Sequence, residues 1–148
     1  MEIRIDNRQN QEAIDLRRLR KTAQLILNVL DCPDGELSLS IVDDAEMTEI
    51  NRDYRDRPRP TNVIAFSMRD GAFPELNPTL LGDVVISSET CRRESQAAGI
   101  PFEARLEELL VHGILHLFDY DHEQSPEAED RMWAKTEEIL ARIHRSRA

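Results

Sequence analysis

The sequence predicts an α/β fold in which about five helices pack on a small mixed sheet of about four strands. Short stretches that alternate like strands are interleaved with longer stretches of helical periodicity. One stretch, LGDVVISS at residues 81–88, is almost continuously apolar, as expected for a strand covered on both faces. The length of 148 residues is typical of one domain, so we expect a single domain over residues 1–148.

The first half of the chain predicts two strands, each followed by a helix. EIRID at residues 2–6 alternates between apolar and charged residues, which indicates a half-buried strand. Apolar residues within 12–30 recur at the helical period, with arginines on the opposite face. ELSLSIV at residues 36–42 alternates again and predicts a second strand. A second helix is expected over residues 45–55, capped by one of the two preceding aspartates.

The second half predicts two more strands and then three helices. PTNVIAFSM at residues 60–68 indicates a third strand, and residues 69–79 form a loop by their Gly, Pro and Asn content. Residues 81–88 are the fourth strand. Serines cap the first of the three helices, and a glycine ends it. The helices are expected over residues 89–99, from 102 to about 117, and from Ser125 and Pro126 onwards.

Charge and composition restrict the possible functions. A net charge of −10 argues against broad, nonspecific nucleic-acid binding. No apolar run approaches the roughly 18 residues that a membrane span needs. The start of the chain, MEIRIDNRQN, lacks the features of an export signal, so we expect a cytoplasmic protein. Cys32 and Cys91 lie far apart without metal-site spacing, and we interpret them as reduced, small apolar residues.

Three histidines in HGILHLFDYDH, residues 112–122, form a candidate metal site. His112 and His116 are four residues apart on an apolar helix, so both should be buried, on one face, close enough to share an ion. His122 cannot join them on a straight helix, because ten residues advance about 15 Å. The chain must therefore turn, and we expect residues Asp119 to Asp121 to form the turn that brings His122 back over the pair.

A three-histidine site leaves a fourth zinc position open, which is the catalytic pattern. Zinc peptidases share the spacing HxxxHxxxxxH but place a glutamate after the first histidine as general base. Gly113 occupies that position here, so a peptidase is the least favoured function. Glu108, one turn earlier, could replace that base, but an orienting role or solvent exposure is preferred for it.

An arginine-rich stretch could supply positive charge for a phosphate. Zinc-activated water can attack phosphorus, and the charge that develops on the phosphate oxygens needs a cation. Arginine matches phosphate geometry with two hydrogen bonds. Most of these side chains are expected to be solvent-exposed loop charges, and geometry does not select one of them. The four arginines are Arg52, Arg55, Arg57 and Arg59.

Three blocks of the sequence resemble the YbeY family of bacterial endoribonucleases, whose hallmark is HGxLHLxGYDH. They are NRDYRDRPRPTNVIAF, LGDVVISSE and HGILHLFDYDH, and their order and spacing match the family over nearly the whole chain. The resemblance implies a zinc-dependent, single-strand-specific endoribonuclease, with one zinc ion per chain. It implies a role in ribosomal RNA maturation, notably at the 3′ end of the small-subunit RNA, and in ribosome quality control. The implied partners are ribosomal RNA and the small ribosomal subunit, with ribosomal proteins or assembly factors as further candidates, and no membrane.

The resemblance also assigns roles to individual residues. His112, His116 and His122 fall on the three metal ligands of the family, and Arg55 falls on its functional arginine. One position departs from the family, because Asp119 replaces the glycine before the tyrosine. We hypothesise that Asp119 has left-handed backbone angles and that its side chain is turned away from the metal.

Three further questions stay open from the sequence. The protein could instead be a ribosome-assembly factor in which a structural zinc only fastens the helix to the following loop. The histidine spacing does not separate zinc from nickel or another borderline metal. The group that attacks the phosphorus of the RNA phosphodiester could be water or the ribose 2′-hydroxyl.

Overall fold

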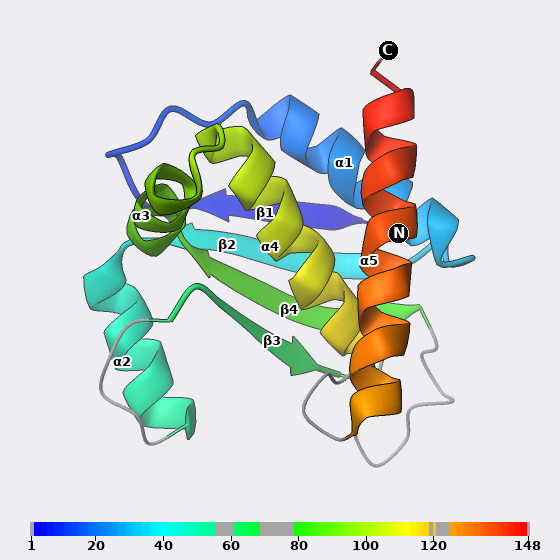
Figure 1. Ribbon diagram of the computed structural model, residues 1–148. Helices are drawn as coiled ribbons and strands as arrows, with labels where there is room; N and C mark the ends of the chain where they lie inside the picture. The colour runs from blue at the N-terminus through cyan, green and yellow to red at the C-terminus, as the bar shows by residue number, and fades with distance from the viewer. Residues whose placement is uncertain (1, 56–60, 69–78, 119, 121–124, 148) are drawn as a thin grey trace.

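The computed structural model describes residues 2–55, 61–68, 79–118, 120 and 125–147, except for the side chain of Arg55. Within these residues, four strands form one mixed sheet with five helices around it (Figure 1), as the sequence predicts. The strands are β1 (Ile3–Asn7), β2 (Glu36–Val42), β3 (Val63–Ser67) and β4 (Leu80–Ser87). The helices are α1 (Leu16–Val29), α2 (Asp44–Arg55), α3 (Ser88–Ala98), α4 (Phe102–Leu117) and α5 (Pro126–Arg145).

The strand order in the sheet is β1-β2-β4-β3. The first three of these strands are parallel, and β3 runs antiparallel to β4 at the edge. At the centre of the sheet, Val84 of β4 is paired with Leu39 of β2 on one side and Ala65 of β3 on the other. The mixed sheet follows from the connections, because helices join the parallel strands whereas β3 leads back along β4.

Helices α1, α4 and α5 cover one face of the sheet (Figure 1). The larger core lies between them and includes Leu39, Ile86 and Ile114, all fully buried. Helix α2 packs on the other face, where Met47 contacts a second, smaller apolar cluster that includes Val85. Helix α2 covers only part of this face, and Asp83 of β4 is exposed there. The expectation that β4 is covered on both faces therefore holds only from Val84 onwards.

The helix ends follow from local capping signals. Asp15 accepts a hydrogen bond from Arg18 N, so α1 begins at Leu16 and not at residue 12. Ser87 caps α3, and Gly99 ends it with a positive φ of 69°. Ser125 accepts a hydrogen bond from Ala128 N at the start of α5. The caps at Ser87, Gly99 and Ser125 lie where the sequence places them, whereas the cap at Asp15 was not predicted.

The two cysteines are free thiols. Cys91 is fully buried against α4, and burial raises the pKa of its thiol to about 12. Cys32 is half-buried. The reading of Cys91 as a small core residue is therefore confirmed. In the described parts of the chain, every helix is too short or too polar to cross a membrane.

Candidate functional site

Helix α4 is buried except along one polar stripe. From Arg105 to the end of the helix, only four side chains are not buried, and they recur every three or four residues. This spacing places them on one side of the helix. Helix α4 packs on β3 and β4. Gly113, the residue after His112, faces Val84 of β4, so the stripe lies along the flank of α4, beside its contact with the sheet. The four residues of the stripe are Arg105, Glu108, His112 and His116.

The two histidines of the stripe point at one another. Their Nε2 atoms lie 2.9 Å apart, and the ring centroids are separated by 4.5 Å with planes inclined at 70°. Both side chains are half-buried, so the expectation that both imidazoles are buried is wrong. The physical reason is that His112 borders a cavity, whereas the sheet covers the side of α4 that carries Gly113.

The histidine pair has the chemistry and spacing that suit a zinc ion. Zinc binds imidazole nitrogen at about 2.0–2.1 Å, so two ligands of a tetrahedral ion lie about 3.3 Å apart. A small rotation of either ring would open the 2.9 Å separation to that value. His122, the third predicted ligand, and Asp119 lie outside the described residues. Within the residues that are described, no group of three metal-binding side chains occurs.

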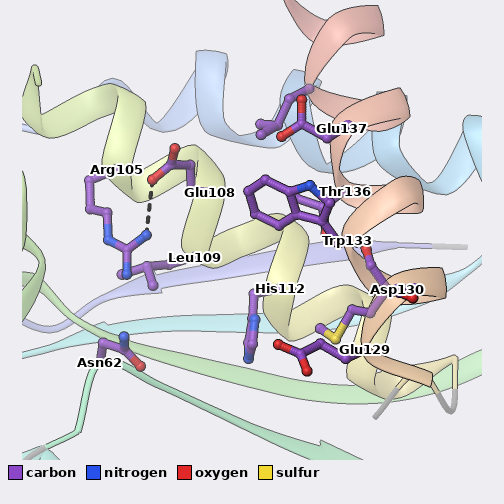
Figure 2. Close-up of a pocket in the computed structure, with 12 residues that line it drawn as sticks. Asn62, Arg105, Glu108, Leu109, His112, Glu129, Asp130, Trp133, Thr136 and Glu137 are labelled. Carbon is purple, nitrogen blue, oxygen red and sulfur yellow. Dashed lines mark hydrogen bonds and ion pairs between the residues drawn. The ribbon is translucent and has the colours of Figure 1, made fainter. Parts of the chain in front are cut away.

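A cavity of about 550 Å³ lies beside the pair, between α4 and α5, with His112 in its wall (Figure 2). We call it the α4–α5 cavity. Leu109, Met132 and Leu140 provide its apolar surface, and Trp133 projects from α5 towards α4. Its other lining residues are Asn62, Arg105, Glu108, Glu129, Asp130, Thr136 and Glu137.

A polar network fixes one side of this cavity. The guanidinium of Arg105 donates to Glu94 and to Glu108, in each case at 2.9 Å, and Asn62 also donates to Glu94. Burial alone would lower the pKa of Arg105, but the hydrogen bonds to the two carboxylates outweigh it and raise the pKa. Glu108 is thus the ion-pair partner of Arg105, and its carboxylate is held towards the guanidinium (Figure 2).

The structure shows where the arginine-rich stretch begins. Arg52 is exposed on α2, and Arg55 is the last residue of that helix. The side chain of Arg55 lies outside the description, as do Arg57 and Arg59. The Tyr54 ring meets Phe66 of β3 edge to face, with centroids 5.3 Å apart, so α2 ends beside the edge strand.

Strand β3 links the end of α2 to the histidine helix. Ile64 and Phe66 belong to the apolar cluster under α2, whereas Val63 belongs to the core under α4. The arginine-rich stretch therefore leads into the strand on which α4 rests.

Sequence reasoning missed most of the cavity. Arg105, together with Glu108 and His112, follows helical spacing, which could have identified the whole stripe. Trp133 and Glu129 lie on α5, and no pattern in the sequence shows that this helix packs beside α4. Trp133 is 65% exposed in the structure. A tryptophan within a strongly charged helical stretch is the one signal that the sequence offered.

Comparison with known proteins gives consistent matches. Residues 4–144 match the family model described as Endoribonuclease YbeY. The chain is 53% identical to Endoribonuclease YbeY of Geobacter sulfurreducens over 142 residues, which cover 95% of each protein. It is 52% identical to Endoribonuclease YbeY of Syntrophotalea carbinolica, again over 142 residues and 95% of each. The solution structure of TM1509 from Thermotoga maritima shares the fold, with a TM-score of 0.66 and 23% identity, and the match covers 96% of this chain and 89% of that one.

Proposed function

This chain belongs to the YbeY family of endoribonucleases, and on that premise we propose that it is a zinc-dependent enzyme that cleaves single-stranded ribosomal RNA. The proposed roles are maturation of the 3′ end of the small-subunit RNA and ribosome quality control. The enzyme would act in the cytoplasm as a single domain over residues 1–148, with the small ribosomal subunit and its proteins as partners.

The observation that carries this proposal is the histidine pair at the wall of a cavity. His112 and His116 converge through their Nε2 atoms at 2.9 Å, on the half-buried stripe of α4. Two imidazoles that converge in this way can hold a zinc ion after a small rotation of either ring. An RNA strand can approach from the cavity side, because the side of α4 that carries Gly113 is closed by the sheet.

We propose that His112, His116 and His122 hold one zinc ion. When bound, the ion would supply a Lewis acid next to the phosphodiester and lower the pKa of a water molecule. The three imidazoles bind in their neutral form, with the other ring nitrogen of each available for an orienting hydrogen bond. The same donor set accepts nickel, so the metal is identified by analysis of the purified protein.

Arg55 is proposed as the residue that stabilises charge on the phosphate. Its guanidinium can donate two parallel hydrogen bonds to phosphate oxygens, and these bonds strengthen as negative charge accumulates there. The position of Arg55 at the end of α2, one short segment before β3, supports this role. Both water and the ribose 2′-hydroxyl fit this scheme as the attacking group.

The test measures bound metal and cleavage of small-subunit ribosomal RNA by the wild type, His116→Ala and Arg55→Ala. We expect His116→Ala to lose metal and cleavage, and Arg55→Ala to keep the metal and lose cleavage. Two control variants come from exposed positions away from the cavity, His144→Ala on α5 and Arg17→Ala on α1. Both should match the wild type in metal content and rate.

A different result would favour the second candidate function, a ribosome-assembly factor with a structural zinc. In that case metal would still follow His116, but neither substitution would change a cleavage rate measured with carefully purified protein. A fourth protein ligand on the ion would support the same conclusion, because structural zinc sites are closed.

A further inference from the structure

The α4–α5 cavity carries a second set of groups, separate from the histidines, that the cleavage chemistry does not use. The indole of Trp133 is 65% exposed and projects over the cavity from α5 (Figure 2). Leu109 and Leu140 add apolar surface to the same cavity. A flat aromatic ligand could stack on this exposed indole and bury its surface against the neighbouring apolar side chains.

The charge of the cavity is negative. Arg105 is already paired with Glu94 and Glu108. Three more carboxylates line the wall, and within the described residues none of their side chains has a hydrogen bond or an ion pair. Such a wall repels phosphate, but its oxygens can accept hydrogen bonds from amino groups. The three residues are Glu129, Asp130 and Glu137.

We infer that the α4–α5 cavity is a subsite for one nucleobase of the RNA substrate, with the base stacked on Trp133 and its amino group directed at the carboxylates of α5. The volume of about 550 Å³ lies in the range of roughly 300–1,000 Å³ found for small-molecule sites. Adenine, cytosine and guanine carry an exocyclic amino group, and glutamate is a known acceptor for that of cytosine. Uracil lacks such a group, so the subsite discriminates against it.

The position of the subsite relates it to the proposed cleavage site. His112 lines the same cavity, so a base held there places its neighbouring phosphate near the histidine pair. This inference rests on the proposed function for its ligand, RNA. It adds a preference among bases that the metal and Arg55 do not provide, because contacts to phosphate carry no sequence information.

Trp133 is the only tryptophan in the chain, so its fluorescence reports directly on the subsite, independently of cleavage. The wild type is titrated with short 2′-O-methyl oligonucleotides of adenine, cytosine or uracil, and with an abasic strand of equal length. We expect saturable quenching by the adenine and cytosine strands at lower concentration than by the uracil strand. The abasic strand should leave the emission unchanged.

Variants separate stacking from amino-group recognition. Affinity for a dye-labelled cytosine strand should fall about tenfold in Trp133→Ala, the size expected for one lost stacked base, and should be largely kept in Trp133→Phe. Glu137→Gln should reduce the preference for cytosine over uracil. The matched control is Glu138→Gln, because Glu138 is the next residue on the same helix, lies outside the cavity and is paired with Lys135.

The outcomes separate this inference from the proposed function. Unchanged affinity in Trp133→Ala, together with intact cleavage, would overturn the subsite and leave the nuclease in place. Quenching by bases in a protein that does not cleave RNA would support the subsite and overturn the nuclease. Quenching by a short arginine-rich peptide but by no oligonucleotide would overturn the nucleobase subsite in favour of a docking site for a basic protein.

Discussion

Gly113 lies so close to Val84 that a Cβ atom on the glycine would stand 2.6 Å from the Cγ1 atom of the valine. The same Cβ would lie 3.1 Å from Val63 Cγ2. Position 113 therefore faces the sheet, and the absence of a side chain lets α4 sit directly on β3 and β4. A glutamate here, as in zinc peptidases, would point into the core and not along the histidine stripe, which argues further against that function.

We expect Gly113→Ala to destabilise the fold and disturb the histidine pair. Val84 is fully buried on the central strand and cannot move aside, so the added methyl group must push α4 away from the sheet. The loss should be about 1–2 kcal/mol in urea unfolding, since overpacking costs more than the helix gains from alanine. Bound metal should fall as well.

Gly99→Ala is the control for that substitution. A Cβ at Gly99 would meet no atom within 4 Å, but the residue has a positive φ. This variant should lose about 1 kcal/mol through backbone strain alone and keep its metal. Equal metal content in both variants would contradict the role assigned to Gly113.

Glu107 on α4 forms ion pairs that connect this helix to α1 and to the chain just after α5, so its substitution should lower the stability of the fold. Its buried carboxylate on α4 accepts a hydrogen bond of 2.5 Å from Arg147, just after α5, and one of 3.5 Å from Arg18 on α1. Both arginines are partly exposed, which moderates the effect, so we expect Glu107→Ala to cost about 1–2 kcal/mol in urea unfolding. Glu138→Ala, which breaks an exposed pair with Lys135, should cost less than about 0.5 kcal/mol.

A double-mutant cycle gives the second test of this contact. The cycle compares Glu107→Ala, Arg147→Ala and the double variant. If the loss of stability in Glu107→Ala arises from the ion pair with Arg147, the double variant should lose less than the sum of the two single losses. Additive losses would show that Glu107 acts through packing alone.

Asp44 should make the fold sensitive to acid. Burial raises the pKa of its carboxyl, but hydrogen bonds from Ser87, Thr90 and Arg93 outweigh this effect, so the pKa is lowered in the folded protein. A lowered native pKa stabilises the fold above the unfolded-state value of about 3.9, and this contribution is lost as the pH falls through the native pKa.

The measurement is urea unfolding at neutral pH and at decreasing acid pH for the wild type and Asp44→Asn. The difference in stability between the two should be largest at neutral pH and shrink in acid. Asp53→Asn, an exposed substitution on the same helix, should show no such trend. A constant difference at every pH would rule out the ionised carboxylate as the stabilising form.

Cys91 should resist alkylation in the folded protein. Its side chain is fully buried and its thiol has a pKa of about 12, so both access and the thiolate form are suppressed at neutral pH. Mass spectrometry after iodoacetamide treatment should find Cys32 modified first. Modification of Cys91 should appear only in urea, and early labelling of Cys91 would indicate local opening between α3 and α4.

Most of the fold could be predicted because the signals were local. Ser87, Gly99 and Ser125 each define a helix end through contacts within a few residues, and the alternation in β2 depends only on the chain itself. The site was predicted less completely. Four-residue spacing correctly places His112 and His116 together, but an apolar helix does not reveal which of its sides faces a cavity. Trp133 joins the site only through the packing of α5 beside α4, which local patterns do not encode.

The place of β4 between β2 and β3 determines the order in which the molecule can be completed during synthesis. When β1, α1 and β2 have left the ribosome, the central strand has not yet been made, and one edge of β2 has no partner. Strands β2 and β3 can complete their pairing only after β4 has been made. Pairing between strands that are distant in the sequence, such as β2 and β4, is slow. Helix α4 follows all four strands in the chain and packs on β3 and β4 as well as on α1 and α3, so the histidines take their place after the strands of the sheet have been made.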